Sequence, residues 1–168
     1  MPRKAVFIDR DNTIAIDGPY CSRPEDLRLF KGVGRSIKKL NDAGFLVIII
    51  TNQSGIGRGF FTCDMLEKIH DKLKKDLAKD GARVDAIYYC PHLPDEGCSC
   101  RKPEIGLIKK ALEDFDISLK DSYVVGDRDH DVELAKKVGC TPILVDNYNP
   151  ASIGFYGAVN LILKNSNK

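Results

Sequence analysis

The sequence predicts an α/β fold in which a Rossmann-like parallel sheet forms the middle of three layers. Strand-like apolar runs alternate with helix-like amphipathic runs along the chain, which is typical of repeated βαβ units. The run Leu-Val-Ile-Ile-Ile at 46–50 contains no polar residue, as expected of a strand that is covered on both faces. The chain has 168 residues and no repeat or low-complexity tract. We therefore expect residues 1–168 to form a single domain.

The boundaries of most elements can be predicted from local patterns. Short apolar runs predict strands over 6–9, 46–51, 86–90, 123–126 and 142–145. Apolar residues at three- and four-residue spacing predict helices over 33–43, 62–79, 104–115 and 129–138. Thr62 can cap one helix, Pro103 suits the first turn of another, and Gly44 and Gly139 follow two more. Residues 147–168 predict a turn around Asn149, followed by either a short strand or a final helix.

Composition and charge restrict the classes of partner. Hydrophobic residues make up 43% of the chain and charged residues 30%, as in water-soluble globular proteins. No apolar stretch approaches the ~20 residues that a membrane-spanning helix needs. The net charge of +2 comes from 26 basic and 24 acidic side chains, which gives no support for a nucleic-acid or membrane partner. With no targeting signal visible, we expect a cytoplasmic monomer that acts on a small metabolite.

Polar side chains follow each of the first four predicted strands. They are Asp9 and Asp11 after the first strand, Thr51 and Asn52 with the glycine-rich segment 53–59 after the second, Arg101 and Lys102 beyond the third, and Asp127 after the fourth. Each group taken alone is consistent with a turn. In a parallel sheet, however, all the carboxyl ends lie on one edge, where open α/β folds bind ligands. The ordered set therefore predicts one active site at that edge.

The residue types at this edge suit phosphoryl transfer to water. Asp9 can attack phosphorus and form an aspartyl-phosphate. Asp11 can protonate the leaving oxygen and then activate the hydrolytic water. Asp9, the backbone carbonyl of Asp11 and Asp127 can supply the oxygen ligands that Mg²⁺ prefers. Thr51, Asn52 and Lys102 can hold phosphate oxygens and balance the charge that develops on them.

The four segments also resemble a known superfamily. Asp9-x-Asp11-x-Thr13, Thr51-Asn52, Lys102-Pro103 and Gly126-Asp127-x-x-x-Asp131 are similar to the signature motifs of haloacid-dehalogenase-like (HAD) hydrolases. The resemblance spans residues 5–146, and it implies the HAD fold with a minimal cap. An Asp at position 11 is typical of the phosphatases and phosphotransferases among them. Asn12 stands where these proteins usually have Gly, and Asn tolerates the left-handed backbone that such a turn requires.

A second group of residues predicts a zinc site. Cys90, His92, Cys98 and Cys100 lie within eleven residues and can complete a tetrahedral Zn²⁺ shell with no open position, as in structural sites. Unpaired core thiols and redox cysteines are the alternatives. We expect the zinc loop, residues 90–102, to be ordered by the metal and to deliver Arg101 and Lys102 to the phosphate. The remaining cysteines, Cys21, Cys63 and Cys140, are expected to be buried fillers.

Two related phosphatase families share these features. The cluster followed by Cys-Arg-Lys-Pro resembles both the D-glycero-D-manno-heptose 1,7-bisphosphate phosphatases and the histidinol-phosphate phosphatases. Segments 51–59 and 17–20 resemble the heptose branch, whereas 92–96 and 122–128 also resemble the histidinol-phosphate branch. A second phosphate needs cationic partners, and Arg58 and Arg101 are available beside Lys102. This favours removal of the 7-phosphate of the heptose bisphosphate over hydrolysis of histidinol phosphate, for whose amine Asp17 or Glu25 would be useful.

The resemblance implies a set of substrate contacts. They fall on Asp17, Gly18, Pro19, Tyr20, Thr51, Asn52, Gln53, Ser54, Arg101 and Lys102, with Arg58 added on grounds of charge. His70 is expected to be an exposed helix residue and His130 a loop residue near the site. Two remote alternatives are a polynucleotide 3′-phosphatase, which the near-neutral charge disfavours, and a non-enzymatic sugar-phosphate-binding module, which the presence of both Asp9 and Asp11 disfavours.

Overall fold

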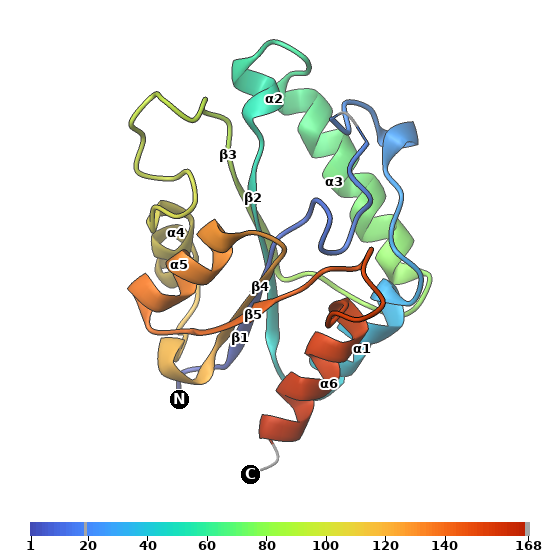
Figure 1. Ribbon diagram of the computed structural model, residues 1–168, viewed down its shortest axis with the longest axis vertical. Coiled ribbons are helices and arrows are strands. Elements are labelled where there is room, and N and C mark those ends of the chain that lie inside the picture. The colour runs from blue at the N-terminus through green and yellow to red at the C-terminus, as the bar shows by residue number, and fades with distance from the viewer. Residues whose placement is uncertain (19, 167–168) are drawn as a thin grey trace.

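A five-stranded parallel sheet lies at the centre of the protein (Figure 1). The structure is a computed structural model that describes residues 1–18 and 20–166. Its strands are β1 (Ala5–Ile8), β2 (Leu46–Asn52), β3 (Ala86–Cys90), β4 (Tyr123–Gly126) and β5 (Thr141–Leu144). They lie in the order β3-β2-β1-β4-β5, and every pairing is parallel. The predicted strands are confirmed to within one residue at each end. The order places β1 at the centre, with the carboxyl ends of β2 and β4 on either side of it.

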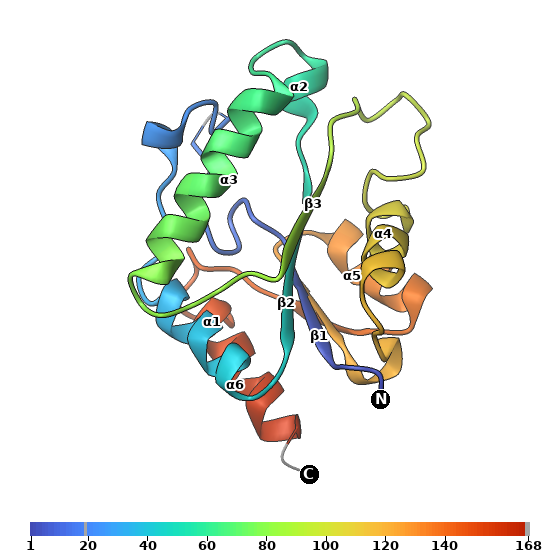
Figure 2. The ribbon, with the colours of Figure 1, turned by 180° about the vertical axis from the view of Figure 1, so that it is seen from behind.

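Helices cover both faces of the sheet, which confirms the predicted three layers (Figures 1 and 2). The helices α1 (Val33–Asp42), α3 (Cys63–Ala78) and α6 (Phe155–Ser166) pack on one face, and α4 (Gly106–Asp114) and α5 (Asp129–Val138) on the other. Short turns complete the chain: α2 (Ser54–Gly57) and the 3₁₀ turns Pro24–Asp26 and Leu119–Asp121. Of the two interpretations left open for residues 147–168, the helix is the one observed. Within the described residues, no helix combines the length and apolar character needed to cross a bilayer.

Alternate side chains of β1 contribute to the two hydrophobic cores, one on each face of the sheet. Val6 and Ile8 pack into the core beneath α1, α3 and α6, whereas Ala5 and Phe7 face α4 and α5. All four side chains are completely buried. Because successive side chains point to opposite faces of a strand, Arg10 continues the row that faces α3, and this determines its environment in the active site.

The start of α4 differs from the prediction. The helix begins at Gly106, so Pro103 lies outside it, in a turn that follows a cis Lys102–Pro103 peptide bond. The preceding loop packs so closely on Gly106 that a Cβ atom there would lie 2.4 Å from the carbonyl oxygen of Ser99. This tertiary contact, which local propensity cannot report, displaces the helix start. The predicted cap at Thr62 is confirmed, since its hydroxyl accepts a hydrogen bond from the Met65 N–H at 3.1 Å.

Candidate active site

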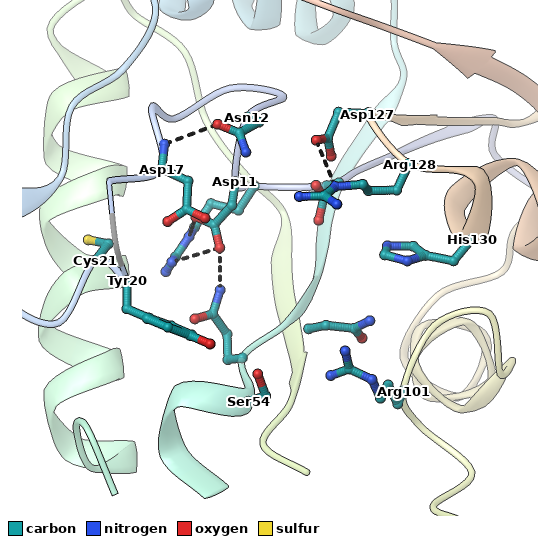
Figure 3. Close-up of a pocket in the computed structure, with 14 residues that line it drawn as sticks. Asp11, Asn12, Asp17, Tyr20, Cys21, Ser54, Arg101, Asp127, Arg128 and His130 are labelled. Carbon is teal, nitrogen blue, oxygen red and sulfur yellow. Dashed lines mark hydrogen bonds and ion pairs between the residues drawn. The ribbon is translucent and has the colours of Figure 1, made fainter. Parts of the chain in front are cut away.

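The carboxyl ends of the central strands open into a cleft of about 220 Å³ (Figure 3). Figure 3 shows Asp11 and Asp17 on one side of the cleft, with Arg101, Arg128 and His130 on the other. The side chains that line it come from the loop after β1, the loop after β2, the segment before α4 and the start of α5. The predicted convergence of distant segments at one edge of the sheet is therefore observed.

Asp9 lies on the floor of this cleft, directly after β1. Its backbone N–H donates to the carbonyl of Val125 at 2.9 Å, which continues the pairing of β1 with β4. Lys102 Nζ donates to Asp9 Oδ1 and to Asp131 Oδ1, each at 2.7 Å, and the Thr13 hydroxyl donates to Asp9 Oδ2 at 3.3 Å. Burial alone would lower the pKa of Lys102, but the charges of Asp9 and Asp131 outweigh it and the pKa is raised. Lys102 is therefore a buried ammonium shared by two carboxylates.

Three carboxylates gather around this point. Asp9, Asp127 and Asp131 each place a carboxylate oxygen within 4.8 Å of the others. Burial and then the charge of Asp9 raise the pKa of Asp127 to about 7, as expected where like charges crowd together. Hard oxygen donors at this spacing fit Mg²⁺. The sequence analysis gave Asp131 no ligand role. The structure brings it to the cluster because it lies in the first turn of α5, four residues after Asp127. Gly126 is required beside it, because a Cβ atom there would lie 2.2 Å from the Asp131 carboxylate.

The Asp11 carboxylate points away from this cluster, toward the opposite side of the cleft. It accepts hydrogen bonds from Arg10 Nε at 2.8 Å and Arg10 Nη2 at 3.2 Å. The Gln53 side-chain amide donates to Asp11 Oδ2 at 3.0 Å and to the Thr51 hydroxyl at 2.8 Å. Asn12 has φ = 60°, so the left-handed backbone expected at this position is present. This turn reverses the chain directly after Asp11.

The predicted substrate residues divide into three groups. Those that line the cleft are Asp17, Tyr20, Asn52, Gln53, Ser54 and Arg101. Thr51 and Lys102 lie buried beneath it, and Asn52 exchanges hydrogen bonds with the Lys102 backbone at 3.0 and 3.2 Å. Gly18 and Arg58 are exposed outside the lining, Arg58 because it lies at the carboxyl end of α2. Pro19 lies outside the described residues.

The four predicted zinc ligands come together beside the cleft. The Cys90, Cys98 and Cys100 sulfurs lie 2.9 to 3.9 Å apart, and His92 Nδ1 is 3.3 Å from Cys90 Sγ and 3.2 Å from Cys100 Sγ. A tetrahedral Zn²⁺ shell with usual bond lengths has ligand separations of about 3.5–3.8 Å, so these residues fit that ion. The Arg101 guanidinium donates to the His92 carbonyl at 3.4 Å, which ties the cluster to the cleft.

Comparisons with known proteins agree with this geometry. A family model described as HAD-hydrolase-like matches residues 99–152. A probable D-glycero-D-manno-heptose-1,7-bisphosphate 7-phosphatase of Thermoplasma acidophilum is 47% identical over 137 residues, which cover 81% of this chain and 86% of that protein. A D-glycero-beta-D-manno-heptose-1,7-bisphosphate 7-phosphatase of Haemophilus ducreyi is 40% identical, over 86% of this chain and 84% of that protein. The chain belongs to the HAD hydrolases, in their heptose-bisphosphate phosphatase family.

Structural comparison leads to the same family. The crystal structure of a D,D-heptose 1,7-bisphosphate phosphatase from B. bronchiseptica, complexed with magnesium and phosphate, superposes with a TM-score of 0.87 at 33% identity. The match covers 96% of this chain and 99% of that one. The predicted superfamily, the α/β fold and the assignment of this HAD-family member as a phosphatase are confirmed.

Several functional features escaped sequence reasoning. Arg10, Asn12, Cys21 and Arg128 line the cleft without having been predicted as contacts, whereas His130 lines it as expected of a residue near the site. His130 belongs to the first turn of α5, so placing it in a loop was wrong, even though the predicted helix 129–138 contained it.

Two further expectations about side-chain exposure were wrong. His70 is 3% exposed, because it lies on the apolar face of α3 with Leu66, Ile69 and Leu73. The three- and four-residue spacing of these positions was the signal that could have placed it inside. Cys63 is exposed, because it opens the first turn of α3 instead of facing the core, whereas Cys21 and Cys140 are buried as expected.

Proposed function

We propose that this HAD phosphatase removes the 7-phosphate of D-glycero-D-manno-heptose 1,7-bisphosphate by way of an aspartyl-phosphate on Asp9. The observation that carries the proposal is the position of Asp9 on the cleft floor, held by Lys102 within the cluster of three carboxylates. The names of relatives that are 38–47% identical support this choice of substrate. The proposed enzyme is a cytoplasmic, single-domain monomer over residues 1–168.

In the first half-reaction, a carboxylate oxygen of Asp9 attacks phosphorus and the bond from phosphorus to the sugar oxygen breaks. Asp11 gives its proton to the departing oxygen, so that the sugar leaves as an alcohol. Lys102 contacts the attacking carboxylate at 2.7 Å and balances charge as the phosphoryl group is transferred. The Thr51 hydroxyl and the Asn52 amide are proposed to hold phosphate oxygens from the end of β2.

In the second half-reaction, water attacks the phosphorus of the aspartyl-phosphate. Asp11, now a carboxylate, takes a proton from that water, and the bond between phosphorus and Asp9 breaks. Asp11 regains its proton and Asp9 its free carboxylate, so the chain returns to its starting state. One carboxyl group thus acts first as the acid and then as the base.

Mg²⁺ would be held by Asp9, the Asp11 backbone carbonyl and Asp127, and Asp131 would hold Lys102 beside them. When bound, it would neutralise the crowded carboxylates and polarise the phosphoryl oxygens. Zn²⁺ would be held by Cys90, His92, Cys98 and Cys100. Its proposed role is structural, because four protein ligands leave no position for substrate.

The second phosphate of the substrate needs cations at the rim of the cleft. Arg101 lies there, and its guanidinium is held beside the cluster of zinc ligands by the His92 carbonyl. Arg58, expected to share this task, lies outside the lining, so Arg101 is proposed as the main partner. A specific observation supports histidinol phosphate as the second candidate. Asp17 lines the cleft and would offer a carboxylate to an amine.

Phosphate release from both candidate substrates, with Mg²⁺ and after EDTA, tests the proposal. We expect a Mg²⁺-dependent preference in kcat/KM for the heptose bisphosphate of at least about a hundredfold, equivalent to about 2.7 kcal/mol of transition-state binding. Asp9→Asn is the control for the active site and should remove turnover of both. A preference for histidinol phosphate would overturn the substrate assignment and leave the chemistry. Full activity in Asp9→Asn would overturn the chemistry.

A further inference from the structure

Arg10 continues the alternation of β1 at a position where an apolar side chain would be expected, because this face of the strand packs into the core. It follows Val6 and Ile8 on the face that packs against α3, and it is 1% exposed. A buried guanidinium is costly unless it is paired. Its Nε and Nη2 groups form a two-pronged contact with Asp11, which leaves Nη1 to find a partner in the core.

His70 supplies that partner from the buried face of α3. Arg10 Nη1 lies 3.5 Å from His70 Nε2, and the imidazole is 3% exposed. Because a guanidinium can only donate hydrogen bonds, His70 Nε2 must be the acceptor, so the ring is neutral and its proton is on Nδ1. Burial and the charge of Arg10 lower the pKa of His70 to about 3, in agreement with a neutral ring.

A second support reaches Asp11 from another element. The Gln53 amide links Asp11 Oδ2, at 3.0 Å, to the Thr51 hydroxyl, at 2.8 Å. The Asp11 carboxylate is therefore held by Gln53 after β2 and by Arg10 against α3. His70 restricts the orientation of the Arg10 guanidinium, because without an acceptor at Nη1 the group can rotate toward other partners.

We propose that His70 is a positioning residue that acts through Arg10 to orient the Asp11 carboxyl group toward the leaving oxygen. The inference rests on the proposed role of Asp11 as acid and base. Its expected signature is a dependence on the leaving group. When Asp11 is misaligned, kcat should fall for substrates whose leaving group must be protonated. It should change little for aryl phosphates, whose leaving groups are stable anions.

The experiment compares an alkyl phosphate with p-nitrophenyl phosphate in His70→Leu and His70→Gln. His70→Leu is expected to lower kcat for the alkyl phosphate about tenfold more than for the aryl phosphate, equivalent to about 1.4 kcal/mol. His70→Gln keeps an acceptor within reach of Arg10 and should stay within about twofold of wild type on both. Inhibition by inorganic phosphate should not change. Ile69→Val, on the same face of α3, is the matched packing control and should leave the ratio of the two kcat values, alkyl to aryl, unchanged.

His70→Asn keeps the experiment decisive if His70→Leu fails to fold. Its amide is polar but too short to reach Arg10, so it should reproduce the selective loss. Equal losses on both substrates in the leucine or asparagine variant, or a glutamine variant as poor as these, would overturn the inference. Wild-type turnover of p-nitrophenyl phosphate tests the phosphatase itself. Its absence would be a failure of the proposed function and not of the role of His70.

Discussion

Replacing Lys102 by Met is expected to destabilise the protein because it removes the ammonium group between two buried carboxylates. The Lys102 side chain is completely buried, and Nζ lies 2.7 Å from both Asp9 and Asp131. Met has a similar shape and no charge, so the substitution tests the charge and not the packing. After it, Asp9, Asp127 and Asp131 would remain within 4.8 Å of one another with no buried cation between them.

Breaking a buried ion pair by removing one partner costs about 3–5 kcal/mol. In a chain of this size, each kcal/mol lowers the melting temperature by about 2–4 °C. We therefore expect a decrease of about 6–20 °C in metal-free buffer at pH 8. Protonation should relieve the repulsion, because the pKa of Asp127 is already raised to about 7. At pH 5.5 the decrease should be smaller, and saturating Mg²⁺ should reduce it in the same way.

Thermal unfolding by circular dichroism measures these shifts. Lys137→Met is the matched control, because Lys137 is paired with Glu104 and Glu133 at the surface, where ion pairs contribute little. A decrease under about 2 °C for Lys102→Met, or one that neither acid nor Mg²⁺ reduces, would refute the view that Lys102 neutralises the carboxylate cluster.

Three further predictions concern the acid, the loop and the metal. Asp11→Asn should slow alkyl phosphates more than aryl phosphates; equal losses in steady-state rates would argue against its role as an acid. Removing zinc with a chelator should increase hydrogen exchange across residues 90–102 and lower kcat, and elemental analysis that finds no zinc in the purified protein would contradict this. Mg²⁺ affinity should fall as the pH drops below about 7, by up to about tenfold per pH unit, because the ion must displace a proton from Asp127. A titration calorimetry profile without this slope would contradict that.

Much of the fold could be predicted because local pattern and global arrangement agree. The apolar run of β2 indicated a strand buried on both faces. Because the carboxyl ends of parallel strands lie on one edge of the sheet, Lys102 was expected near Asp9 although 93 residues separate them. The start of α4 could not be predicted, because the packing of the zinc loop on Gly106 overrides the local signal from Pro103.

The active site was predictable where a residue's chemistry and its position on a strand gave the same answer. Arg10 was missed because a charged residue after a strand usually faces water, and its burial depends on Asp11 and His70 together. Spacing along α3 indicated that His70 is buried, whereas its polar identity suggested exposure. Asp131 stood within a quoted motif, but its contact with Lys102 depends on how the first turn of α5 meets the zinc loop.

Chemical trapping of the phosphorylated residue tests whether Asp9 is the nucleophile. Wild-type protein would be mixed with the heptose bisphosphate and Mg²⁺, quenched in acid during turnover and reduced with borohydride, which converts an aspartyl-phosphate to homoserine. Mass spectrometry of the peptide that contains residues 5–10 would then locate the modification. We expect homoserine at position 9 and none in Asp9→Asn. A phosphoryl group trapped on another residue, with Asp9 unmodified, would contradict the assignment of Asp9 as the nucleophile.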